Sequence, residues 1–84
     1  MASTKHIALL GSTGSIGRQT LDVIDSFPDR FRVVALACQR SVEDVVAQAK
    51  RYGPKLVAMA DETAAGRAAE ALRGSGIEVA AGVD

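Results

Sequence analysis

Short apolar runs alternate with segments of helical periodicity along this 84-residue chain. The apolar runs fall at residues 7–10, 31–38, 56–60 and 77–81 and are rich in Ile, Val, Leu and Ala, as in strands buried in a parallel sheet. Between the runs, apolar residues recur every three or four positions, which predicts helices that begin near residues 15, 41 and 61. The pattern therefore predicts four strands in strict alternation with three helices.

Each predicted helix has a recognisable end and an apolar stripe. The first ends before Pro28, the second runs from a Ser41-x-x-Asp44 start to Gly53, and Asp61 can cap the third. The positions at helical spacing are Ile16, Thr20, Val23, Ile24 and Phe27 in the first helix. The apolar stripe of the second is Val42, Val45, Val46, Ala49 and Tyr52, and the residues of the third that can face a sheet are Ala65, Ala68, Ala71 and Leu72.

This order of elements predicts an α/β fold with a parallel sheet and right-handed crossovers. We expect a Rossmann-like three-layer α/β/α arrangement, namely the parallel β-α-β-α-β-α-β half of a doubly wound sheet that is covered on both faces. We place the fourth strand at the outer edge, beyond the third. In such folds ligands bind at the carboxyl ends of the strands.

Composition narrows the classes of function. Ten basic and ten acidic residues cancel, so no long-range field would recruit nucleic acid or an anionic membrane. The single cysteine, Cys38, can form no internal disulfide and offers no metal-ligand spacing. No apolar run has the length of a signal peptide or a membrane span. A cytoplasmic protein is the expectation.

The segment between the first strand and the first helix reads Gly-Ser-Thr-Gly-Ser-Ile-Gly from Gly11 onward. Gly11 can form a tight turn, Gly14 lacks the Cβ that would keep a pyrophosphate away from the backbone N–H groups of the helix start, and Gly17 lets the helix pack closely on the strand. Thr13 and Ser15 can add hydroxyl donors. The spacing differs from the dinucleotide fingerprint G-x-G-x-x-G and from a P-loop, so the alternative is a glycine-rich turn that Ser15 caps and that binds no ligand.

The loop that follows the second predicted strand indicates the type of cofactor. NAD-binding units hold an Asp or Glu at the end of the second strand, where it binds the ribose hydroxyls. Here the sequence is Gln39-Arg40-Ser41, which offers a planar cation and a hydroxyl instead of a carboxylate. The sequence favours NADP over NAD. The alternatives are an exposed surface arginine for Arg40 and a simple helix cap for Ser41.

The stretches LLGSTGSIGRQTLDVI and FRVVALA closely resemble the N-terminal NADPH-binding segment of the 1-deoxy-D-xylulose 5-phosphate reductoisomerase family. The resemblance implies cofactor contacts from Thr13, Gly14, Ser15 and Ile16. The family's second loop commonly reads Gly-Lys/Arg-Asn, and those positions fall on Gln39, Arg40 and Ser41. The predicted cofactor-binding set is Gly11, Thr13, Gly14, Ser15, Ile16, Gln39, Arg40 and Ser41.

The same resemblance implies an NADPH-dependent enzyme that uses Mg or Mn to convert 1-deoxy-D-xylulose 5-phosphate to 2-C-methyl-D-erythritol 4-phosphate in isoprenoid synthesis, and a homodimer for the full-length family. Residues 1–84 would then be the N-terminal part of the cofactor domain. The family's metal and catalytic residues lie outside the matching stretch, so we predict no catalytic or metal-binding residue here and no activity for this chain alone. The alternatives are a fragment of another NADP-dependent dehydrogenase and a non-catalytic nucleotide-binding module.

Overall fold

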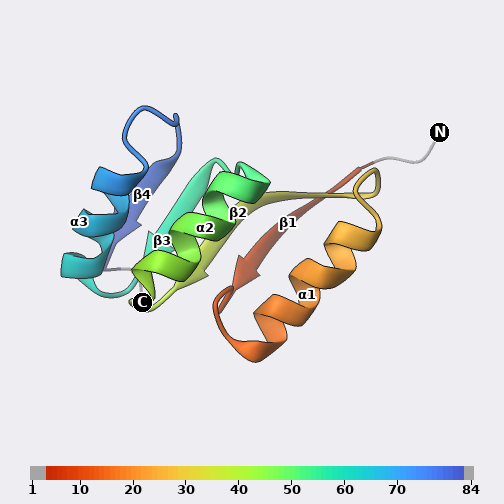
Figure 1. The fold of residues 1–84 in the computed structure, drawn as a ribbon, viewed down its shortest axis with the longest axis horizontal. Helices are drawn as coiled ribbons and strands as arrows, with labels where there is room; N and C mark the ends of the chain where they lie inside the picture. Colours follow the sequence, from red (N-terminus) through yellow and green to blue (C-terminus); the bar gives the residue numbers. More distant parts are fainter. Residues whose placement is uncertain (1–3, 83–84) are drawn as a thin grey trace.

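The sheet of this protein has four parallel strands in the order β1-β2-β3-β4 (Figure 1). The structure is a computed structural model that describes residues 4–82. The elements are β1 (Lys5–Leu10), α1 (Ser15–Ser26), β2 (Phe31–Cys38), α2 (Val42–Tyr52), β3 (Leu56–Met59), α3 (Glu62–Ala71) and β4 (Glu78–Ala81). The Rossmann-like alternation, the parallel sheet and the outer position of the fourth strand are confirmed.

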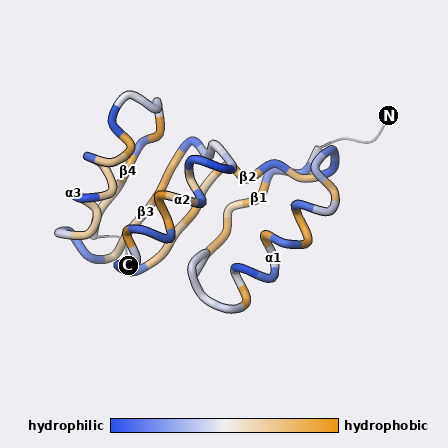
Figure 2. The backbone as a smooth tube through the Cα atoms, viewed as in Figure 1, coloured by the Kyte–Doolittle hydropathy of each residue, from blue (hydrophilic) through white to orange (hydrophobic). Residues whose placement is uncertain are grey.

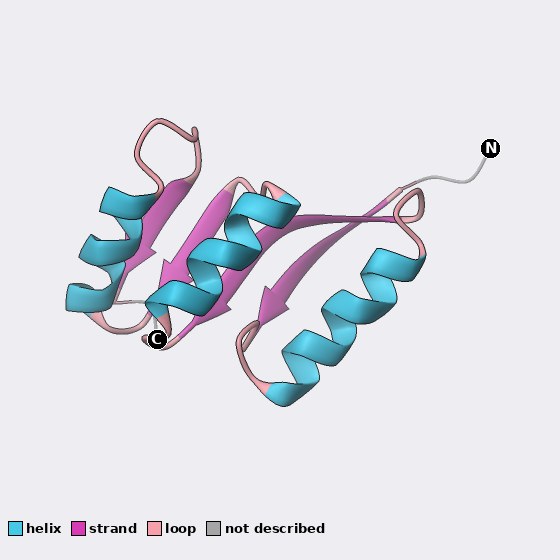
Figure 3. Ribbon diagram, viewed as in Figure 1, coloured by secondary structure: helices cyan, strands magenta, loops and turns pink. Residues whose placement is uncertain are grey.

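All three helices lie on the same face of the sheet (Figure 3). Each crossover moves the chain one strand further in the same direction, and right-handed crossovers then place every connecting helix on one side. The layer that the three-layer arrangement needs on the other face is not present in residues 4–82.

The hydrophobic core lies between the helices and the sheet. Leu36, Val57 and Met59 are completely buried on the helix side of β2 and β3, against Val45 and Ala49 of α2. The strand residues that alternate with them form an apolar surface that no helix covers, and we call it the open face. By strand register its apolar residues are Ala8, Leu10, Ala35, Ala37, Leu56, Ala58 and Ala80, and His6, Arg32 and Glu78 lie on the same face near the starts of their strands. Figure 2 shows the strands mostly in the orange of apolar residues.

The helical spacing of the apolar residues in α1 is confirmed, but most of these residues do not face the core. Gly17, Leu21 and Ile24 are the buried residues of this helix, whereas Ile16 is 80% exposed and Val23 is 53% exposed. The helix has apolar residues on two sides, and periodicity alone marked the side that faces away from the core. The predicted stripe of α2 is confirmed, and in α3 only Ala71 departs from the prediction, because it is exposed.

The predicted helix starts are correct, but one of the two caps uses no side chain. Asp61 caps α3 because its Oδ1 accepts a hydrogen bond of 3.0 Å from the Ala64 N–H. Ser41 is the N-cap of α2, yet its hydroxyl makes no capping bond. Within residues 4–82 no helix is long and apolar enough to cross a membrane.

Candidate functional site

A crevice of about 530 Å³ lies at the carboxyl ends of β1, β2 and β3. Its size is in the range of small-molecule sites. Both loops that the sequence singles out contribute to it. The residues that line the crevice are Gly11, Thr13, Gly14, Ala37, Cys38, Gln39, Arg40, Ser41 and Ala60. Six of the eight predicted cofactor-binding residues are therefore brought together, whereas Ser15 and Ile16 lie beside the crevice in the first turn of α1.

The three glycines of the first loop differ in what requires them. Gly11 has a φ of 68°, which a side chain would strain. A Cβ on Gly17 would lie 2.8 Å from the Ser12 Cα, so Gly17 allows α1 to pack against the loop. Gly14 has a φ of −81°, and a Cβ there would lie 3.5 Å from the Gly11 carbonyl oxygen, which is an ordinary contact. Nothing within the described chain requires a glycine at position 14.

The start of α1 offers backbone donors for an anion. The first helical bond of α1 runs from the Arg18 N–H to the Gly14 carbonyl, at 2.9 Å. The N–H groups of Ser15, Ile16 and Gly17 therefore have no partner inside the helix, and the helix dipole favours negative charge beside them. The Gly14 N–H is already used, because it donates to the Gly11 carbonyl at 3.1 Å. Gly14 is also the N-cap of α1, in place of Ser15.

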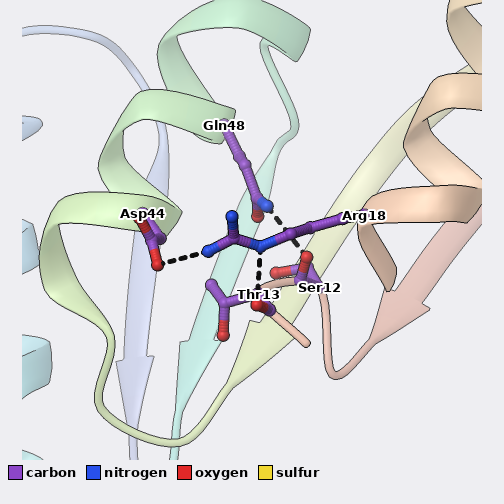
Figure 4. Close-up of polar contacts among 5 residues, drawn as sticks. All are labelled: Ser12, Thr13, Arg18, Asp44 and Gln48. Carbon is purple, nitrogen blue, oxygen red and sulfur yellow. Dashed lines mark hydrogen bonds and ion pairs between the residues drawn. The ribbon is translucent and has the colours of Figure 1, made fainter. Parts of the chain in front are cut away.

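Side chains of α1 and α2 hold the first loop (Figure 4). Gln48 Nε2 donates to the Ser12 carbonyl at 2.8 Å, and Arg18 Nε donates to the Thr13 carbonyl at 3.0 Å. The Arg18 guanidinium also forms an ion pair of 2.7 Å with Asp44. Sequence reasoning missed these contacts. The one signal for Gln48 was an amide side chain in the apolar pattern of α2, directly before the buried Ala49.

The second loop is anchored through its backbone and leaves its side chains free. The Gln39 carbonyl accepts a bond of 3.0 Å from the Asp61 N–H, and the Ala60 N–H donates to the Cys38 carbonyl. Arg40 is exposed and forms no ion pair within residues 4–82. An unneutralised guanidinium at the rim of the crevice favours an anionic ligand group.

Cys38 lines the crevice and has the properties of a structural thiol. Burial raises the pKa of the Cys38 thiol, although the backbone N–H of Ser41 opposes the shift. A protonated thiol is a poor nucleophile. The sequence did not indicate Ala60, which forms part of the crevice because it directly follows β3. No cluster of three or more His, Cys, Asp or Glu residues that could hold a metal ion occurs in the described part of the chain.

Comparisons with known sequences point to one protein family. The protein-family model for 1-deoxy-D-xylulose 5-phosphate reductoisomerase matches residues 7–84. The reductoisomerase of Nitrosospira multiformis is 44% identical over 86 residues, an alignment that covers 100% of this chain and 22% of that protein. The chain thus spans about a fifth of the length of the curated relatives it matches.

The solved structures that resemble this chain are reductoisomerases as well. The reductoisomerase of Zymomonas mobilis in complex with NADPH matches 95% of this chain and 21% of its own, with a TM-score of 0.89 and 42% identity. A reductoisomerase in complex with NADPH, fosmidomycin and magnesium matches 93% of this chain and 19% of its own, with a TM-score of 0.86 and 26% identity. The chain belongs to the 1-deoxy-D-xylulose 5-phosphate reductoisomerase family.

Proposed function

We propose that the crevice between the two loops binds NADPH for a reductoisomerase that converts 1-deoxy-D-xylulose 5-phosphate to 2-C-methyl-D-erythritol 4-phosphate. The observation that carries the proposal is the convergence of Gly14, at the start of α1, and Arg40 on one crevice. A solved relative is a complex with NADPH, which supports the same choice of cofactor.

The residues present suit the two anionic parts of NADPH. The pyrophosphate would lie on the loop from Gly11 to Ser15, where Gly14 leaves room for it and the first N–H groups of α1 can donate to it. Thr13 lines the same space, and Ile16 would contact neighbouring atoms of the cofactor. When bound, NADPH supplies the hydride for the reduction.

The ribose 2′-phosphate would lie on the second loop. Arg40 would bind it through the guanidinium, and Ser41 through a hydroxyl that makes no capping bond. Gln39 would contact the cofactor through its side chain, which the glycine that the family commonly has at this position lacks. Among residues 4–82, no carboxylate lines the crevice to bind the ribose hydroxyls as in NAD-type sites.

The other parts of the reaction are proposed for residues beyond this chain. A relative was solved with magnesium and fosmidomycin, and we propose Mg or Mn as the divalent ion, with ligands outside residues 1–84. Residues 1–84 would be the N-terminal part of the NADPH-binding domain. The exposed apolar side of α1 and the open face support this, since further chain can pack against both. Homodimer formation and a cytoplasmic location stay predictions.

The test is turnover by the full-length protein. NADPH should be oxidised when 1-deoxy-D-xylulose 5-phosphate and Mg²⁺ are both present, and replacing NADPH by NADH should slow the reaction strongly. Oxidation of NADPH without the sugar phosphate would indicate another reaction. Rates that are equal with NADH would remove the role given to Arg40.

A further inference from the structure

The backbone of Ser12 is held from two directions. Its N–H donates to the Ala37 carbonyl of β2 at 3.0 Å, and its carbonyl accepts the bond of 2.8 Å from Gln48 Nε2 of α2 (Figure 4). Ser12 is completely buried. A buried carbonyl without a donor would be unfavourable, so Gln48 stabilises the conformation in which this carbonyl points inward.

The hydrogen bond from Gln48 to the loop is less exposed to water than the neighbouring ion pair of Arg18 and Asp44. The side chains of Arg18 and Asp44 are 58% and 49% exposed, and an exposed pair contributes little because water and salt screen it. Gln48 is half-buried, and its Oε1 is buried without a hydrogen-bond partner in the described residues. Burying an unpaired oxygen is unfavourable, and the only hydrogen bond of the Gln48 side chain within the described residues is the one to the loop.

We propose that Gln48 is a positioning residue for nucleotide binding: it fixes the loop from Gly11 to Gly14 before the cofactor arrives. This inference rests on the proposed function. A loop that is already ordered pays less conformational entropy when the pyrophosphate binds. Gln48 also belongs to the helix that starts directly after Arg40 and Ser41, so its bond joins the two loops of the crevice through α2.

The inference predicts which ligands respond to a change at position 48. Gln48 acts on the loop assigned to the pyrophosphate, which NADPH and NADH share. The variant Gln48→Met keeps the length of the side chain and removes the donor. Both dissociation constants should rise by the same factor of about ten, equivalent to 1.4 kcal/mol, and the ratio between the two nucleotides should stay constant.

The free energy of unfolding should change much less in Gln48→Met than the affinity for the nucleotides. The substitution leaves the Ser12 carbonyl without a donor, but it also removes Gln48 Oε1, a buried acceptor that lacks a partner. A matched control exists at the far ends of the same two helices, where Tyr52 Oη donates to Asp25 Oδ1 of α1 at 2.9 Å. Tyr52→Phe breaks a link between α1 and α2 without touching the loop.

The experiment titrates NADPH and NADH into the full-length protein and into the Gln48→Met, Gln48→Glu and Tyr52→Phe variants. Amide hydrogen exchange is measured on the same proteins without nucleotide. We expect weaker binding of both nucleotides by the two Gln48 variants, parental affinity for Tyr52→Phe, and faster exchange at the Ser12 and Gly14 amides only when Gln48 is changed. Gln48→Glu should lose at least as much as Gln48→Met, because its carboxylate cannot donate.

Three results would overturn the inference. They are unchanged affinities in folded Gln48 variants, a loss confined to NADPH, and an equal loss in Tyr52→Phe. A parent protein that binds neither nucleotide would instead refute the proposed function, and loop exchange without nucleotide would then still decide whether Gln48 holds the loop.

Discussion

Gly14 and Gly17 lie three residues apart, and different neighbours explain each of them. Gly17 faces the backbone of Ser12, which leaves no room for a Cβ. Gly14 faces the crevice in a backbone conformation that any residue can adopt. The fold of the chain thus explains Gly17, whereas Gly14 is explained by the close approach of the ligand that we propose.

The charge of Arg40 should select the cofactor. In the full-length protein Arg40→Asp should weaken NADPH binding by about ten- to a hundred-fold, as expected for about 1.5 to 3 kcal/mol from a hydrogen bond to a charged group. NADH, which has no 2′-phosphate, should bind no worse. Titration of both nucleotides at low and moderate salt measures the effect.

The matched control is Arg32→Asp, which makes the same change of charge on the exposed Arg32 of β2, outside the crevice residues. It should leave the NADPH to NADH ratio at its parental value. An Arg40→Asp variant that keeps the parental ratio would return Arg40 to the role of a surface residue.

Cys38 provides a chemical probe of the crevice. Because burial raises the pKa of its thiol, the protonated form dominates at neutral pH, and alkylation by iodoacetamide should be slow and accelerate as pH rises. Bound NADPH should slow it further, since Cys38 lines the crevice. Peptide mass spectrometry measures the rate. Fast alkylation at neutral pH that NADPH does not change would argue against this site.

At the scale of the elements, hydrophobic periodicity and helix-end signals predicted the features that depend on residues close in sequence. The strand runs, the helix starts at Ser41 and Asp61 and the order of elements all depend on neighbouring residues. The close packing at Gly17 was predicted from the sequence, but hydropathy did not separate the buried side of α1 from its exposed apolar side. The bond between Gln48 and Ser12 joins residues 36 positions apart, which local spacing does not reveal.

The two helix caps should differ in strength. Asp61→Ala removes the hydrogen bond to the Ala64 N–H and should weaken the first turn of α3 by about 1 kcal/mol. Ser41→Ala should change the first turn of α2 much less, because the Ser41 hydroxyl makes no capping bond. Amide exchange in each first turn, measured without nucleotide, compares the two. Equal acceleration in both variants would contradict the assignment of the caps.

At the scale of the whole molecule, one face of the sheet remains without a helical layer. The open face is apolar, and the exposed side of α1 adds Ile16, Val23 and Phe27. The sequence predicted a sheet covered on both faces, but all crossovers of the described chain pass on one side. Helices on the other face would require further strands that add to the sheet beside β1, on the side away from β2. The sequence pattern of residues 4–82 does not contain such strands.

The isolated 84-residue chain should therefore self-associate and have no activity. Its apolar surface and the unpaired edges of β1 and β4 favour association, and no cluster of residues that could hold a metal ion occurs among residues 4–82. Light scattering coupled to size exclusion and an NADPH oxidation assay test both statements. A stable monomer, or turnover of the sugar phosphate, would contradict them.

The central claim is that this crevice holds the pyrophosphate of NADPH, and the Gly14→Ala variant tests it most directly. Gly66→Ala in α3 is the control, because a Cβ at Gly66 would contact nothing within 4 Å. Calorimetric titration of NADPH into the full-length proteins should give parental affinity for Gly66→Ala. Gly14→Ala should melt close to the parent and bind NADPH at least about ten-fold more weakly, since its methyl group would displace the phosphate from charge-assisted hydrogen bonds. Parental NADPH affinity in a folded Gly14→Ala protein would contradict the claim.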